Sequence, residues 1–524
     1  MTLRDRLKDA LSLADIMSKE ESTAKGKELR VSVPRGDHAL WAPALDRPDP
    51  VQLLREQGDS RVQALLPLRY ERMSASAFTF YRGGALIMAS DLADTPVTGI
   101  QVQLCGDAHI SNFGLFSSPE RRTVFDINDF DETLPGPWEW DVKRLAASVE
   151  ICGRDNGLAR KQRKAAVLAC VQGYREGMRA FADKGNLDVW YAHLDVDTLR
   201  EKMVANMKSA SSKKGAAKAS DKKADAKPHA KTDAARVSGP NAAAVKATNK
   251  VIDKAKAKNS ARAIQKMTEI VDGKLRIISD PPVIVPLREL IAENMGEDRA
   301  EKFDETAIER LMHAVLAEYR LTLTPDKRRL IDSYTPVDVA HKVVGVGSVG
   351  TRAWIVVMRG ADEEDPLVLQ IKEAQASVLE RFVGKSEYKK HGQRVVAGQR
   401  AMQSASDMLL GWCSIPDANT RKKKHYYVRQ LWDGKGSIDL SKLDSEQLKT
   451  LSRACGWTLA HAHARTGDRF AIASYLGKSD KFDKAIAQFA SKYADQNELD
   501  YARFMQALEA GEMTAAATMA SSEM

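Results

Sequence analysis

The stretch of sequence that decides the fold runs from residue 104 to 141 and reads LCGDAHISNFGLFSSPERRTVFDINDFDETLPGPWEWD. Seven polar side chains crowd into it: Asp107, His109, Asn112, Asp126, Asn128, Asp129 and Asp131. Carboxylates at this density repel one another unless a cation or strong hydrogen bonds offset the repulsion. We therefore expect this stretch to hold a divalent metal ion or phosphate groups.

The residues around these side chains predict short strands followed by helices. Residues 100–104 and 123–127 are rich in apolar and β-branched types, which is typical of strands. Residues 141–152 place Leu145, Val149 and Cys152 on one helical stripe, and 160–182 continue as a helix. Between 337 and 431, four β-rich runs are separated by turns and by one helical stretch at 392–410. We therefore expect an α+β protein.

A glycine pattern lies between two of these β-rich runs, in VVGVGSVG. A dinucleotide-binding fold needs a helix directly after the glycines, whereas here residues 354–357 predict a strand. Strand, glycine loop and strand is the arrangement with which protein kinases cover the phosphates of ATP. We assign nucleotide binding to four residues of the loop: Gly345, Gly347, Ser348 and Gly350.

Lys372 closes the next predicted strand, in LVLQIKEA. From there it would reach the α- and β-phosphates beneath the glycine loop, and the alternative is an exposed lysine at a strand end. Glu380 is the best candidate to pair with it, with Glu387 as a fallback. The run YYVRQL at 426–431 is either the strand that leads into a hinge, whose backbone would bind adenine, or an ordinary buried strand.

The pattern D-x-H-x-x-N at 107–112 resembles the catalytic loop of aminoglycoside and choline phosphotransferases. The resemblance implies that Asp107 accepts the proton of a substrate hydroxyl and that Asn112 binds Mg²⁺. Asp129 follows a strand and fits the metal-binding aspartate, with Asp131 as a second ligand. All-oxygen ligands and phosphate favour Mg²⁺ or Mn²⁺. We expect His109 to hold this catalytic loop by hydrogen bonding.

Four further side chains have open roles. Asp141 matches the structural aspartate that those phosphotransferases place at the start of the next helix. Asp126 is either another metal ligand or a strand-end acid. His461 and His463 are two residues apart, a spacing that puts them on different faces of a helix. We expect core or capping roles for them, with metal binding or closure of the site as the alternatives.

Several phrases resemble an uncharacterised bacterial family, domain of unknown function 2252, over nearly the whole chain; among them are FTFYRGGALIMASDLA, FDINDFDETLPGPWEWDVKRLA, VVGVGSVGTR and LQIKEAQASVLE. The family has no established activity, and the resemblance implies remote similarity to the kinase-like, aminoglycoside phosphotransferase-like fold. Kinases run from glycine loop to catalytic loop, whereas here the order is reversed. A two-lobed kinase-like fold would therefore be circularly permuted, which is tolerable where chain termini lie close together. Cys105 stands where those phosphotransferases usually have His.

This order predicts six segments. They are an irregular N-terminal arm at 1–75, a C-lobe-like part with the catalytic and metal loops at 76–207, a basic linker at 208–258, a helical connector at 259–335, a β-rich N-lobe-like part at 336–432, and C-terminal helices at 433–524.

Charge and composition limit the partners. The chain carries a net charge of +9, and residues 208–258 alone hold 13 Lys and one Arg against four Asp. We interpret this low-complexity stretch as a solvated linker or as a weak, non-specific contact with nucleic acid. The sequence contains no run of about 18 apolar residues, so no membrane span is expected. The five cysteines are scattered, which disfavours zinc and disulfides and fits a cytoplasmic location.

The predicted function is an ATP- and Mg-dependent phosphotransferase that acts on an unidentified hydroxyl or amine acceptor. One alternative is a metal-dependent hydrolase that uses the Asp/His cluster to activate water. The other is a non-catalytic pseudokinase that binds a nucleotide or a partner.

Overall fold

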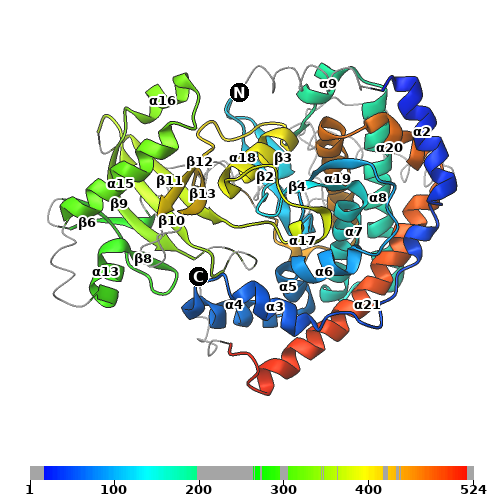
Figure 1. Cartoon of the computed structure of the whole chain (residues 1–524), viewed down its shortest axis with the longest axis horizontal. Helices are drawn as coiled ribbons and strands as arrows, with labels where there is room; N and C mark the ends of the chain where they lie inside the picture. Colours follow the sequence, from blue (N-terminus) through cyan, green and yellow to red (C-terminus); the bar gives the residue numbers. More distant parts are fainter. Residues whose placement is uncertain are drawn as a thin grey trace, which may run out of the picture.

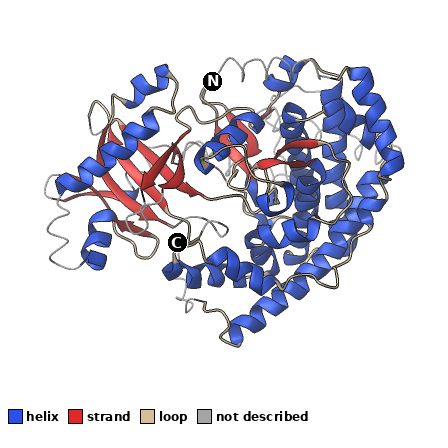
Figure 2. Ribbon diagram, in the orientation of Figure 1, coloured by secondary structure: helices blue, strands red, loops and turns tan. Residues whose placement is uncertain are grey.

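A computed structural model describes residues 17–196, 264, 266–271, 274–295, 305–343, 345, 347, 349–362, 364–416, 423–431, 436 and 438–515. The basic stretch at 208–258 and Ser348 lie outside the described residues. The molecule is a mixed α/β protein with a sheet-rich side, at the left of Figure 1, and a helix-rich side (Figures 1 and 2). None of the described helices is both long and apolar enough to cross a bilayer.

Six antiparallel strands form the main sheet, in the order β12-β13-β11-β10-β9-β8. They are β8 (Ile284–Pro286), β9 (Thr335–Lys342), β10 (Ala353–Arg359), β11 (Pro366–Ala374), β12 (Gly411–Pro416) and β13 (Lys423–Gln430). Apolar side chains cover both faces. Val356 and Leu369 pack in one cluster with residues of α15 (Glu305–Arg320), and Ile355 and Val368 pack in a second with Ile277. The glycine-rich turn joins β9 to β10.

The helix-rich side is built on α7 (Trp138–Asp155), α8 (Arg160–Ala182), α19 (Ser445–Thr466) and α21 (Lys481–Glu509). Helices α8 and α19 approach each other at backbone distance. A Cβ added at Gly456 would lie 2.0 Å from the carbonyl oxygen of Cys170, and one at Gly173 would lie 2.4 Å from that of Arg453. The contact between the two helices therefore requires glycine at both positions.

Two small sheets carry the polar loops. Strand β1 (Gln101–Leu104) pairs with β4 (Leu134–Pro137), and β2 (Phe113–Ser117) pairs with β3 (Thr123–Ile127). Residues 105–112 join β1 to β2, and residues 128–133 join β3 to β4. The two loops lie side by side, because Asn128 N donates to Asn112 O at 2.8 Å and Cys105 Sγ donates to Asp129 O at 3.4 Å.

Four short helices lie along the junction of the two sides (Figure 1). They are α3 (Pro50–Gly58), α4 (Leu66–Ser74), α5 (Ala77–Gly83) and α6 (Ala85–Leu92), and we call residues 50–92 the α3–α6 segment. Its apolar residues Val51, Tyr70 and Phe80 pack against Phe504 of α21. The segment is therefore part of the folded core.

The strands predicted at 100–104 and 123–127 and the helix at 160–182 form where expected. The helix expected at 392–410 is shorter, since α18 (His391–Met402) ends where the backbone of Ser404 turns to donate to Asp126 at 2.8 Å. The stretch at 259–335 contains β6 (Thr268–Val271), β7 (Lys274–Ile277) and β8 besides helices, because the apolar residues of β8 extend the main sheet next to β9.

The close contact of α8 and α19 yields a stability prediction. Gly456→Ala places a Cβ against a backbone oxygen that cannot rotate away. The overpacking should lower the free energy of unfolding by about 1–3 kcal/mol. This loss is in excess of the roughly 1 kcal/mol that alanine gains in helix propensity. Gly36→Ala is the control, because its Cβ meets no atom within 4 Å and its φ is −69°. Urea unfolding should show a loss for Gly456→Ala alone, and equal stability of both variants contradicts the packing argument.

Candidate functional site

The loop at 105–112 is held by Asp141 at the start of α7. Its carboxylate accepts hydrogen bonds from the backbone N–H groups of Cys105 at 2.7 Å and Gly106 at 3.0 Å, and its Oδ2 lies 3.2 Å from His463 Nε2. Gly106 has φ +84°, and a Cβ there would lie 2.3 Å from Glu132 O. Only glycine fits this position. The glycine and the hydrogen bonds to Asp141 together fix the backbone conformation of the loop that carries Asp107.

Asp107, the predicted proton acceptor, is held by contacts to both its side chain and its backbone. Arg144 Nε donates to its Oδ1 at 2.9 Å, and the side-chain amide of Asn112 donates to its backbone oxygen at 2.7 Å. Burial raises the pKa of Asp107 and outweighs the opposing effect of Arg144. Burial, aided by Arg82 and Arg144, holds the pKa of His109 well below its ordinary value. Its Nε2 lies 3.7 Å from Asp107 Oδ2, and its buried Nδ1 has no partner among the described residues, so the hydrogen bond by which His109 was expected to hold the loop is not formed.

The loop at 128–133 brings two carboxylates to Lys372 of β11. Lys372 Nζ forms an ion pair with Asp131 and lies 3.9 Å from Asp129 Oδ2, while Tyr427 donates its hydroxyl to Asp131 Oδ1 at 2.9 Å. Burial alone would lower the pKa of Lys372, but the two carboxylates outweigh it and raise that pKa. Burial and repulsion from Asp131 raise the pKa of Asp129, whereas Lys372 overcomes burial and lowers the pKa of Asp131.

The glycine-rich turn is tied to the α3–α6 segment. Arg61 Nη1 donates to Val349 O at 2.5 Å, and Val62 N donates to Gly350 O at 2.8 Å. Arg72 Nη1 reaches Gly345 O at 3.4 Å. The turn therefore lies over the loops that carry the predicted site residues.

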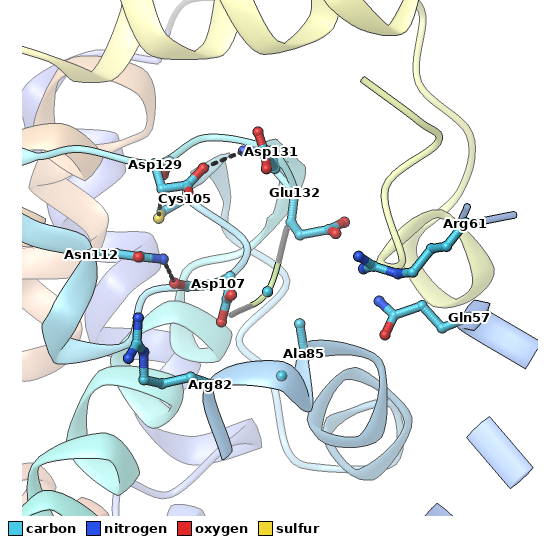
Figure 3. Close-up of a pocket in the computed structure, with 12 residues that line it drawn as sticks. Gln57, Arg61, Arg82, Ala85, Cys105, Asp107, Asn112, Asp129, Asp131 and Glu132 are labelled. Atoms are coloured by element: carbon cyan, nitrogen blue, oxygen red, sulfur yellow. Dashed lines mark hydrogen bonds between the residues drawn. The ribbon is translucent and has the colours of Figure 1, made fainter. Parts of the chain in front are cut away.

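A small cavity of about 40 Å³ lies between the two polar loops and the α3–α6 segment (Figure 3). It is lined by Gln57, Arg61, Arg82, Gly83, Ala85, Cys105, Asp107, Asn112, Asp129, Asp131, Glu132 and Gly347. The structure thus brings together the predicted proton acceptor, the predicted metal ligands and one predicted glycine of the turn.

Other predicted residues lie elsewhere. Glu380 begins α17 (Glu380–Val383), and within the described ranges Lys372 forms its ion pairs with the two aspartates rather than with Glu380 or Glu387. Asp126 accepts hydrogen bonds from Ser404 N and Oγ, both at 2.8 Å, and so ties β3 to the end of α18. The sequence left Asp126 as either a metal ligand or a strand-end acid, and these hydrogen bonds support the second role.

The two histidines of α19 are core residues. His461 Nε2 lies 2.8 Å from Val189 O, and His463 Nδ1 lies 2.9 Å from the hydroxyl of Tyr174. Both side chains are buried. Their hydrogen bonds hold α19 against α9 (Asn186–Tyr191) and α8, and His463 additionally supports Asp141.

The predicted metal-binding atoms at the cavity are oxygens. They belong to the carboxylates of Asp129 and Asp131 and to the side-chain amide of Asn112, whose nitrogen donates to Asp107 O. Among the residues that the structure describes, no three His, Cys, Asp or Glu side chains are grouped to hold a metal ion. Mg²⁺ is commonly held by one or two carboxylates together with substrate phosphates. The donor set therefore fits Mg²⁺ that arrives with a phosphate ligand.

Sequence reasoning missed several residues of this site. Arg144 follows Asp141 by three residues on α7, a spacing that places both on one helical face, and this signal could have pointed to it. Arg394 of α18 donates to Thr133 O at 2.5 Å and to Asp131 O at 2.7 Å, a contact that no local pattern marks. Arg61 and Arg82 are equally unmarked, because only the fold brings them to the cavity.

The fold and the site define a mixed α/β protein with a carboxylate-rich cavity where its sheet meets its helices. The model of the family described as "Uncharacterized protein conserved in bacteria (DUF2252)" matches residues 61–243 and 222–507. These matches cover most of the chain, and the chain belongs to this family. No curated protein and no solved structure matched the chain in these comparisons.

Removing the cation that pairs with the loop at 128–133 tests this geometry. Lys372→Met leaves Asp131, whose side chain is 28% exposed, without its ion-pair partner. The expected loss of stability is about 2–3 kcal/mol, below the range for a fully buried pair. Lys385→Met removes an exposed lysine and should change stability by less than about 0.5 kcal/mol. Urea unfolding measures both, and a loss for Lys372→Met no larger than that of the control would argue against the ion pair.

Proposed function

We propose that this protein transfers the γ-phosphoryl group of Mg·ATP to a hydroxyl or amine of an acceptor. The observation that carries the proposal is the meeting of Lys372 with Asp129 and Asp131, which are more than 200 residues away in the sequence. These aspartates line one cavity with Asp107 and Asn112. Phosphoryl transfer depends on positioning and on neutralising charge, and this group of side chains suits both tasks.

The order of elements on the sheet side supports a kinase-like arrangement. A glycine-rich turn joins β9 to β10, a lysine lies on the next strand β11, and helix α18 follows before β12 and β13. Protein kinases use this sequence of glycine loop, strand lysine and helix. The loops with Asp107 and Asp129 come earlier in this chain, so the proposed arrangement is circularly permuted. It also departs from kinases in that α18 supplies Arg394 rather than a glutamate partner for the lysine.

Each residue takes a role from its surroundings. Asp107, whose pKa is raised, would take the proton of the acceptor hydroxyl. The hydroxyl oxygen of the acceptor would bond to the γ-phosphorus while the bond from that phosphorus to the ADP oxygen breaks. Asn112 and Asp129 would hold Mg²⁺, which when bound offsets the charge on the phosphates. Lys372 keeps Asp131 ionised and in place. A hydrolase that also uses His461 or His463 draws no support here, because both rings are engaged in the core.

Paired variants test this assignment. Asp107→Asn should lower the rate of ADP formation with a pool of hydroxyl and amine acceptors by about 10²–10⁴-fold, because the proton acceptor is lost, while Mg·ATP still raises the melting temperature. Asp129→Asn should lose both the turnover and the Mg-dependent stabilisation. A ligand at about 100 times its Kd stabilises by roughly 2.7 kcal/mol, which a melting curve resolves.

Three outcomes have separate meanings. Unchanged turnover in both variants rules out this mechanism. Mg·ATP binding without turnover in the wild type supports the pseudokinase alternative. Metal-dependent release of phosphate from phosphomonoesters without any nucleotide effect supports the hydrolase.

The pH dependence of the rate follows from the surroundings of Asp107. The group accepts a proton only when it is ionised, so the rate should fall as the pH drops through its raised pKa. Arg144 lowers this pKa, and Arg144→Gln should therefore move the acid limb of the pH–rate profile to higher pH. Arg144→Lys keeps the charge and should move the limb less. An acid limb that stays in place, or moves to lower pH, in a folded Arg144→Gln variant contradicts Asp107 as the base.

A further inference from the structure

The α3–α6 segment contributes two arginines to the cavity, and the phosphoryl transfer described above uses neither. Arg61 follows α3, and Arg82 lies in the last turn of α5. We infer that Arg61 and Arg82 form a binding site for a phosphate group in this cavity. The inference rests on the proposed function for the reaction, but its ligand chemistry follows from the two arginines themselves.

Arg61 faces the cavity with part of its guanidinium unused. The residue is only 8% exposed, and its Nη1 donates to Val349 O. Within the described part of the chain, its buried Nε has no hydrogen-bond partner. Figure 3 shows the side chain turned toward the carboxylate side of the lining, with its guanidinium facing Glu132. The Nη2 group donates to none of the described residues and is not among the fully buried atoms, so it is available to a phosphate oxygen.

Arg82 approaches the cavity beside Asn112 and Asp107 (Figure 3). Its Nε is likewise buried, and none of the described residues accepts a hydrogen bond from it. Burial lowers the pKa of Arg82 despite the nearby charges of Asp107 and Asp129, which shows that these carboxylates do not fully compensate its desolvation. Neither Nη group donates to a described residue, so the guanidinium retains donors for an anion.

Two neighbouring cations, Arg144 and Lys372, are each paired with a carboxylate. Arg144 lies 2.8 Å from Asp107 Oδ1, and Lys372 forms an ion pair with Asp131. Among the described residues, Arg61 and Arg82 form no such pair with any carboxylate within 4.0 Å. Unlike Arg144 and Lys372, they carry a charge that none of the described carboxylates matches at ion-pair distance.

Size and charge select phosphate as the ligand class. A cavity of about 40 Å³ has room for roughly three water molecules, which is on the scale of one phosphate group rather than a whole nucleotide. Guanidinium groups bind phosphate oxygens through two parallel N–H donors. An anion beside Asp107, Asp129 and Glu132 needs such cations to offset repulsion. The phosphate is either the terminal group of ATP or a group carried by the acceptor.

The test measures melting temperature in sodium phosphate against sodium chloride of equal ionic strength. The wild type should be stabilised by phosphate, and Arg61→Gln and Arg82→Gln should each raise the apparent Kd for phosphate at least tenfold. Arg55→Gln removes an exposed arginine of α3 that does not line the cavity, and it should bind phosphate as the wild type does. Arg61→Lys and Arg82→Lys keep the charge without the fork and should retain part of the affinity, which guards against a misfolded Gln variant.

Nucleotides separate the two sources of the phosphate. If the site takes the terminal phosphate of ATP, the Gln variants weaken Mg·ATP but not Mg·ADP. If it takes a phosphate of the acceptor, both nucleotides bind as before and only free phosphate binding is lost. Absence of a phosphate effect in the wild type, or equal phosphate binding in the wild type and the folded Gln variants, overturns the inference. Arginine-dependent phosphate binding without any Asp129-dependent response to Mg·ATP keeps the site and rejects the proposed transfer.

Discussion

The ion pair between Lys372 and Asp131 joins the sheet to the loops of the helix-rich side. Asp131 accepts a second contact from Tyr427 of β13, and its backbone oxygen accepts one from Arg394 of α18. Three elements of the sheet side therefore converge on one loop residue. A carboxylate surrounded in this way stays ionised, because the energy of the ion pair exceeds the penalty of burial. Together with the hydrogen bonds from Ser404 to Asp126 and from Val378 to Glu132, this contact holds the two sides in position around the cavity.

The charges around the cavity divide into two groups. Asp131 is matched by Lys372 and Asp107 by Arg144, so these carboxylates are positioned before any ligand binds. Asp129 lies farther from Lys372, at 3.9 Å, and its pKa is raised by burial and by Asp131. A site with one under-compensated carboxylate and cations nearby suits a metal ion and a phosphate that arrive together, since each offsets the charge that the other meets.

Local patterns predicted what depends on local geometry. Strands β1 and β3 and helix α8 follow from hydrophobic periodicity. The resemblance to phosphotransferase loops pointed to Asp107, Asn112 and Asp129, which line one cavity, and their roles stay predictions. The partner of Lys372 could not be read in the same way, because Glu380 is near it in sequence whereas Asp131 is near it only after folding. The end of α18 is likewise decided by the distant Asp126. Arg61 and Arg82 lie outside every motif, and only tertiary packing brings them to the cavity.

In the proposed arrangement, the loops with Asp107 and Asp129 come before the glycine-rich turn along the chain. Each part of the site is held by a separate structural device: Asp141 accepts hydrogen bonds from the loop of Asp107, Gly106 supplies the bend, and Val62 N donates to Gly350 O of the glycine-rich turn. None of these devices requires that the sheet precede the helices along the chain. The chain order is therefore free to change as long as the contacts between the two sides persist. The α3–α6 segment, however, has to stay next to the sheet. The glycine-rich turn is anchored to it, and its residues Arg61 and Arg82 line the cavity.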